Sequence, residues 1–206
     1  MEFLLVATLV ALAAWQFKTR EQRGRIALLG RHLGRYQIEK HMETLTQGYL
    51  RALGEADPQR REQIWSLLRP AEQELCGQCA RLATDFAGVA PADSRVSRFP
   101  LYLPLAVRLL PQATFDMRRA LALHADAICR AVQREGESNK DRAFVVLAEV
   151  LLLQHTCHWF CRSRAVASAR LLARHRTAYP QLVAAVSRET RAAYGPLVGL
   201  RPAPPA

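Results

Sequence analysis

The chain has 206 residues, of which half are hydrophobic, and it carries a formal net charge of +11. This composition allows a buried core, which excludes global disorder and leaves room for one domain plus an appendage. The charge lies at the two ends: residues 1–40 contain seven Lys/Arg and three Glu, residues 162–206 contain eight Arg and one Glu, and the middle is neutral. If the ends meet in the fold, they form one basic face that attracts anions.

Residues 1–17 favour a transmembrane anchor. The run from Phe3 to Ala14 is apolar apart from one threonine, and Trp15 and Phe17 follow where interfacial aromatic side chains belong. The helix from Phe3 to Phe17 rises about 22 Å, so crossing a hydrocarbon core of roughly 30 Å requires bilayer thinning or snorkelling by the lysine that follows. The basic cluster after the span predicts that the rest of the chain is cytoplasmic.

Two alternatives to a membrane anchor remain open at this stage. The first is a cleaved signal peptide with Ala11 and Ala13 at the cleavage site, although Glu2 replaces the usual basic n-region. The second is a buried N-terminal helix of a soluble protein. The next most apolar run, residues 143–153, is too short for a span, so we interpret it as a core helix.

Residues 18–56 are predicted to form a basic juxtamembrane or stalk helix that continues to about Leu53. Apolar residues recur at helical spacing in two stripes, and these stripes point to nearly opposite sides of one helix. Two glycines, Gly30 and Gly34, lie at the end of the first stripe. The helix therefore either bends near Gly34 or contacts different partners on its two faces.

Residues 57–200 are predicted to form a compact cytoplasmic domain of about six to seven helices, so the fold class is all-α. Asp57 is expected to cap one helix and Pro70 to begin the next. The proline-rich stretch from about residue 88 reads as a loop, and its apolar part, Leu101–Leu110, either packs irregularly or enters a membrane interface. No strand is predicted.

Further capping residues divide the second half of that domain. Thr114, Asn139, Ser163 and Ser187 precede apolar periodic segments, and each is expected to begin a helix. The longest of these helices runs to about Cys161, and the others are shorter and richer in arginine. Residues 201–206 are predicted to be a disordered tail.

Cysteine and histidine are close together near the end of the longest helix. Cys157, His158 and Cys161 share one helix face, and zinc binding would need further ligands such as Cys76 and Cys79. The alternative that we favour is a core helix in which these cysteines are small buried side chains that fill space. The spacing shows no disulfide framework, so all five cysteines are expected to be free thiols in a reducing compartment.

The pair Cys76 and Cys79 also belongs to a CGQC sequence, which is similar to the thioredoxin-type redox motif. That motif requires a helix N-terminus after a strand, where the helix dipole lowers the pKa of a thiol. Helix-forming residues precede Cys76 and no strand is predicted, which weighs against redox chemistry. Glu149 is expected to be buried and paired with Arg118 or Arg119.

Basic residues near both ends of the chain are expected to contact an anionic surface. They are Lys18, Arg20, Arg23, Arg25, Arg162, Arg164, Arg170, Arg174 and Arg176. A membrane anchor would make anionic lipid the nearest acidic partner. Aromatic residues for base stacking are not interleaved with these arginines, so a nucleic-acid partner is not favoured.

These patterns together predict a single-pass membrane protein with a cytoplasmic helical domain that acts as a non-catalytic interaction or scaffold module. Its partners would be anionic lipid and an unknown protein, and no cofactor is predicted. A metal-binding or thiol-redox protein is the first alternative, and a module that binds nucleic acid through the basic C-terminal segment is the second.

Overall fold

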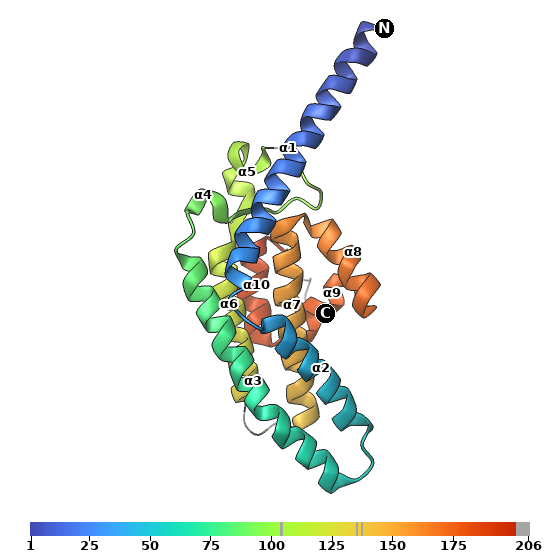
Figure 1. Ribbon diagram of the computed structural model, residues 1–206, viewed down its shortest axis with the longest axis vertical. Coiled ribbons are helices and arrows are strands. Elements are labelled where there is room, and N and C mark those ends of the chain that lie inside the picture. Colours follow the sequence, from blue (N-terminus) through green and yellow to red (C-terminus); the bar gives the residue numbers. More distant parts are fainter. Residues whose placement is uncertain (104, 135, 137, 201–206) are drawn as a thin grey trace.

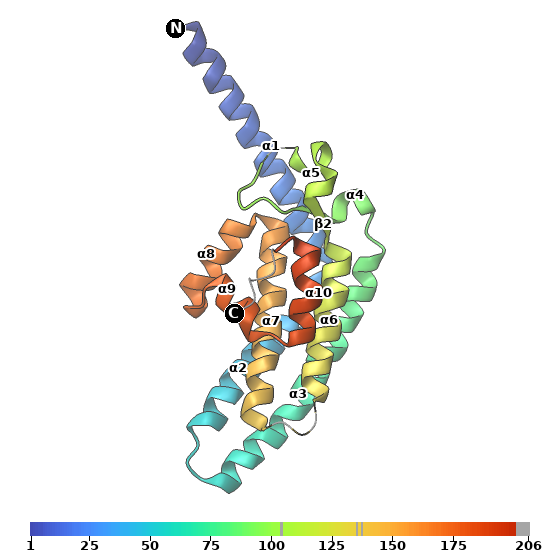
Figure 2. The ribbon, with the colours of Figure 1, turned by 180° about the vertical axis from the view of Figure 1, so that it is seen from behind.

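In the computed structural model, the chain folds into an elongated helical body from which the first helix projects (Figures 1 and 2). The structure describes residues 1–103, 105–134, 136 and 138–200, and the predicted tail at 201–206 lies outside them. The predicted all-α fold is confirmed. The helices are α1 (Glu2–Leu33), α2 (Ile38–Gly54), α3 (Pro58–Ala87), α4 (Pro91–Ser94), α5 (Ala106–Leu109), the 3-10 helix η1 (Pro111–Ala113), α6 (Met117–Gln133), α7 (Asn139–Cys161), α8 (Arg164–His175), α9 (Tyr179–Ala185) and α10 (Arg188–Val198).

The single helix predicted to continue to about Leu53 is interrupted after Leu33, and the bend near Gly34 is one of the two alternatives that the apolar stripes leave open. Gly34 ends α1, and its backbone N–H donates to the carbonyl of Gly30. The new direction allows α2 to bury Leu45 and Tyr49 against α3 and α7. Residues 18–56 therefore place one side of each helix against the body.

Helix α3 differs from the prediction of two helices that meet at Pro70. The structure contains one uninterrupted helix from Pro58 to Ala87, and Asp57 caps it by accepting a hydrogen bond from the N–H of Gln59. An internal proline removes one backbone hydrogen bond, but the buried face of α3 continues on both sides of it, with Leu68 before and Leu75 after. Packing against α2 and α6 outweighs the local signal to stop.

The stretch before α6 contains two strands that the sequence does not predict. Strand β1 (Arg95–Ser97) pairs antiparallel with β2 (Thr114–Asp116), so that Val96 lies opposite Phe115. Both of these side chains are buried. A three-residue strand is too short to show alternation in the sequence, which explains why this stretch reads as a loop.

Helices α6 and α7 form the centre of the body, and α3, α8 and α10 pack around them. The residues that cap these two helices lie close to the predicted ones: Asp116 caps α6 instead of Thr114, and Ser138 caps α7 instead of Asn139. The later caps are as predicted, because the side chain of Ser163 caps α8 and that of Ser187 caps α10.

A disulfide joins Cys76 of α3 to Cys129 of α6, so the prediction of five free cysteines is wrong. Cys79, Cys157 and Cys161 are free. The sequence does not show which helices become neighbours, and the pair forms because α3 and α6 pack side by side along much of their length. The bond closes a loop in which the two cysteines are 53 positions apart.

We predict that Cys129→Ser lowers the free energy of unfolding of the oxidised protein by about 2–4 kcal/mol, because the unfolded chain gains freedom when this loop is opened. Denaturation in detergent measures the change. Cys161→Ser is the matched control, since it removes a free and partly buried thiol. Five reactive thiols in the denatured, unreduced protein would contradict the bond.

Candidate functional site

The N-terminal part of α1 has no protein packed against it. Every residue from Met1 to Phe17 is exposed except the half-buried Ala14. We call residues 1–17 the anchor segment. Its large apolar side chains in contact with solvent are Met1, Phe3, Leu4, Leu5, Val6, Leu9, Val10, Leu12, Trp15 and Phe17.

Two helices in the described part of the chain are long and apolar enough to cross a membrane, α1 and α7. They differ in burial: none of the apolar window of α1 is buried, whereas 56% of that of α7 is buried inside the protein. Helix α7 is thus the core helix that the sequence predicts. By length and composition α1 remains the candidate for a span.

The second part of α1 is fixed to the body by polar and apolar contacts. Gln22 is buried, and its side-chain oxygen accepts a hydrogen bond of 2.7 Å from the guanidinium of Arg162. Arg25 donates to the carbonyl of Phe160 at 3.2 Å and pairs with Glu21 at 2.7 Å. These contacts join α1 to the end of α7, so the anchor segment leaves the body in a defined direction.

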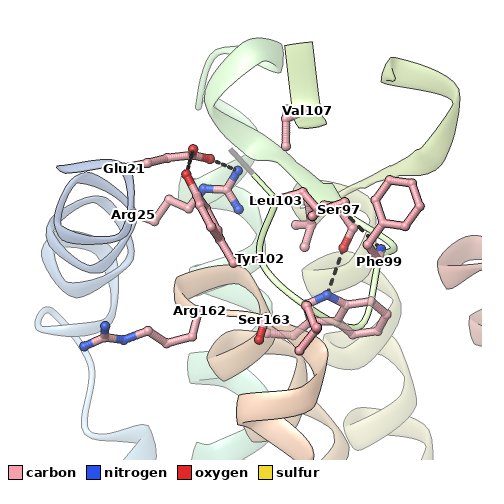
Figure 3. Close-up of a pocket in the computed structure, with 12 residues that line it drawn as sticks. Glu21, Arg25, Ser97, Phe99, Tyr102, Leu103, Val107, Arg162 and Ser163 are labelled. Atoms are coloured by element: carbon pink, nitrogen blue, oxygen red, sulfur yellow. Dashed lines mark hydrogen bonds and ion pairs between the residues drawn. The ribbon is translucent and has the colours of Figure 1, made fainter. Parts of the chain in front are cut away.

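A small cavity of about 20 Å³ lies where α1 meets the β1–α5 connection and the α7–α8 turn (Figure 3). Tyr102 donates a hydrogen bond to the carboxylate of Glu21 across it, and the indole of Trp159 donates to the carbonyl of Ser97 at 2.9 Å. The volume is about that of one water molecule. These hydrogen bonds therefore hold the β1–α5 connection against α1. The cavity between them is too small for a substrate.

The basic residues expected to face an anionic surface separate into three groups. Lys18, Arg20 and Arg23 are exposed on α1 directly after the anchor segment. Arg25, Arg162 and Arg164 make contacts within the protein, and the guanidinium of Arg164 lies 5.5 Å from the ring centre of Trp159. The remaining group, on α8 and just after it, is exposed and consists of Arg170, Arg174 and Arg176.

The two basic ends of the chain do meet in the fold, through the contact between Arg162 and Gln22. The third group lies elsewhere. Arg170 and Arg174 line an open cavity of about 250 Å³ between α7 and α8, together with His158 and His175. The nine residues thus do not form one continuous face: one group follows the anchor segment, and another lies along α8.

The cysteine and histidine residues do not form a metal centre among the described residues, which contain no group of three or more His, Cys, Asp or Glu side chains that could hold an ion. Cys76 is bonded to Cys129 and cannot act as a thiolate ligand. His158 lines the α7–α8 cavity, while Cys157 and Cys161 are partly buried on α7. The zinc hypothesis therefore loses Cys76, one of the two ligands that it needed from α3.

Thiol chemistry is also poorly supported by the surroundings of the cysteines. Cys79 is buried in the middle of α3, and burial raises the pKa of its thiol to about 12. Burial raises the pKa of Cys157 well above the usual range and that of Cys161 to about 11. A nucleophilic thiol needs the opposite shift in pKa.

Glu149 is fully buried, as predicted, but the predicted pairing with Arg118 or Arg119 is wrong. Its carboxylate accepts hydrogen bonds from the backbone N–H of Ser187 at 3.0 Å and from the hydroxyl of Thr190 at 2.8 Å. Arg118 instead pairs with Asp116. The beginning of α10 supplies the donors, because its first backbone N–H groups lack partners within the helix and favour negative charge.

A second buried polar group links α6, α7, α9 and α10. Thr156 donates to the carbonyl of Leu152 at 2.9 Å, so its oxygen can only accept from Nε2 of His124 at 2.9 Å and from the hydroxyl of Tyr194 at 3.2 Å. Tyr179 donates in turn to Tyr194. His124, Thr156 and Tyr194 have no exposed surface, so these side chains specify how the helices pack and cannot reach a substrate in this conformation.

No protein family model, no curated protein sequence and no solved structure matches the chain. Any function must therefore be argued from its own residues. The sequence alone predicted the apolar N-terminal helix, and its role as an anchor stays a prediction. Sequence reasoning missed the Tyr102–Glu21 contact, because those residues are 81 positions apart and neither belongs to a motif.

We predict that stability falls as the pH decreases below about 6.5. Burial lowers the pKa of His124 and of His155 to about 3, so both are neutral in the folded protein at neutral pH. As the pH falls, the histidines of the unfolded chain bind protons before those of the folded protein. The free energy of unfolding is therefore highest above about pH 6.5. It decreases towards pH 3 by up to about 1.4 kcal/mol per pH unit for each histidine.

Denaturation in detergent between about pH 7.5 and pH 5 measures this slope. His124→Gln removes one titrating group, and the slope of the variant is expected to be smaller by up to one histidine's share. An unchanged slope in the variant would show that His124 is not held neutral by the fold.

Proposed function

We propose that the protein is a single-pass membrane protein in which the anchor segment crosses the bilayer and the helical body lies on the cytoplasmic face as a non-catalytic interaction or scaffold module. The observation that carries this proposal is the exposed apolar surface of residues 1–17 on a helix whose continuation is firmly packed.

The cost of leaving this surface in water supports a membrane location. Burying one large apolar side chain is worth about 1.5–3 kcal/mol, and the anchor segment exposes a continuous set of them. Soluble monomers rarely expose contiguous apolar patches of this kind. A helix satisfies its own backbone hydrogen bonds within lipid, while Trp15 and Phe17 suit the interface and Lys18 suits the headgroups.

The interior of the body supports a non-catalytic role. Nε2 of His124 and the hydroxyls of Thr156 and Tyr194 bond to one another in the interior. They have no exposed surface, whereas a general acid or base must reach a substrate proton. The exposed apolar residues Leu50, Leu53 and Leu67 lie on α2 and α3, whose connection forms the end of the body opposite the anchor segment (Figure 1). This end is available to a protein partner.

Two features of the chain bear on which side of the membrane the body occupies. Lys18, Arg20 and Arg23 are exposed directly after the span and favour the cytoplasm, whereas a disulfide is typical of oxidising compartments. We give the charges priority because they act at the span itself and because three of the five cysteines remain free thiols.

The anchor is tested by extracting membranes with alkaline carbonate. The full chain is expected to stay in the membrane fraction, and Leu5→Arg combined with Leu9→Arg to be released, because each arginine costs about 2.5–3.5 kcal/mol at the centre of a span. Leu50→Arg with Leu67→Arg, at exposed positions on the opposite end of the body, is the matched control and should be retained. Release of the unmodified chain would contradict the anchor.

Orientation is tested separately with a topology reporter fused after Ala206. A signal from a reporter that is active only in the cytoplasm is the expected result. A signal from the opposite reporter would reverse the orientation and leave the anchor unaffected.

A further inference from the structure

The connection between β1 and α6 exposes a row of leucines on the body. We call its described residues, 99–103 and 105–110, the leucine loop. Leu101 is 64% exposed and Leu109 is 71% exposed, and the other leucines in contact with solvent are Leu103, Leu105 and Leu110. Soluble proteins rarely expose so many large apolar side chains in one short connection. Exposed apolar patches of this kind mark interaction sites.

The leucine loop is fastened to the body at several points. The carbonyl of Pro100 accepts a hydrogen bond of 2.9 Å from the N–H of Ala165, and Tyr102 bonds to Glu21 (Figure 3). Within α5, Ala106 is buried. Leu101 and Leu103 line the small cavity beside α1 with part of their surface, and all five leucines keep surface in contact with solvent. The leucines are therefore presented by a segment with fixed contacts.

The position of the leucine loop relative to the anchor segment identifies what it faces. Glu21, its contact on α1, lies four residues after Phe17, a rise of about 6 Å along the helix. The headgroup layer on each side of a bilayer is about 5–8 Å thick. Both views show α5 beside α1, at the end of the body from which the anchor segment projects (Figures 1 and 2). If the anchor segment crosses the bilayer as proposed, the loop lies at the depth of the lipid interface.

The charges around the loop match this environment. Arg108 is exposed and adjoins Leu109, and Lys18 and Arg20 are exposed on α1 just beyond the span. Leucine side chains next to basic residues are the composition of segments that lie in the interface of a membrane containing anionic lipid.

We propose that the leucine loop is a second membrane contact, whose leucines enter the interface of the leaflet from which α1 emerges and whose arginine faces anionic phospholipid headgroups. This inference rests on the proposed membrane anchor. Two contacts, the span and the loop, fix the orientation of the body, because a single helix leaves it free to rotate about its axis.

The test uses the full chain reconstituted into vesicles of phosphatidylcholine and phosphatidylglycerol. Leu109→Cys is labelled with an environment-sensitive fluorophore, and Leu67→Cys, exposed at the opposite end of the body, is the matched control. Cys157 and Cys161 are replaced by alanine in both proteins, and buried Cys79 does not compete for the label. Flotation of the vesicles reports the anchor, and quenching by spin-labelled lipid reports the loop.

The expected result is that both proteins float with the vesicles, while only the label at position 109 shifts to the blue and loses fluorescence to the spin-labelled lipid. Flotation without quenching at position 109 would overturn the loop contact and leave the anchor intact. Failure to float would overturn the anchor and the loop contact together. Shielding of position 109 that depends on protein density and not on lipid would assign the loop to a second copy of the chain.

Discussion

The continuity of α1 determines the direction in which residues 1–17 leave the helical body. One helix without a break contains an exposed apolar segment and a segment whose polar side chains are bonded to the end of α7. A flexible linker would leave the body free, whereas a packed helix transmits the direction of the anchor to it. The Gln22–Arg162 and Arg25–Phe160 contacts are thus the joint between the anchor and the body.

The interior of the body consists of close-packed helices with polar groups that bond to one another. Glu149 fixes the beginning of α10, and the group around Thr156 fixes α6, α7 and α10 relative to each other. Unpaired polar groups in this core would be costly, so these contacts favour one arrangement of the helices. The leucine loop lies near the anchor segment and Leu50, Leu53 and Leu67 lie at the opposite end, while the exposed basic groups follow the anchor segment and lie along α8. This distribution is compatible with the proposed scaffold role, in which exposed surfaces contact lipid or a partner protein.

Local signals in the sequence predicted much of the fold. The caps at Asp57, Ser163 and Ser187, the bend near Gly34 and the buried core helix α7 all follow from residues close to one another in the chain. The errors concern long-range packing. Pro70 lies inside α3 because its neighbours pack on both sides, and Cys76 meets Cys129 because α3 and α6 are adjacent. The partner of Glu149 and the contact between Tyr102 and Glu21 likewise depend on the tertiary fold.

A depth profile of α1 in a lipid bilayer tests the central claim most directly. Spin labels are placed at positions 5, 9 and 23 of the full chain, and their accessibility to oxygen is compared with that to a water-soluble relaxing agent. Membrane insertion predicts that oxygen reaches position 9 best and that the aqueous agent reaches position 23 best, since Leu9 lies within the anchor segment and Arg23 on exposed helix beyond it. Equal accessibility of all three positions to the aqueous agent would contradict insertion.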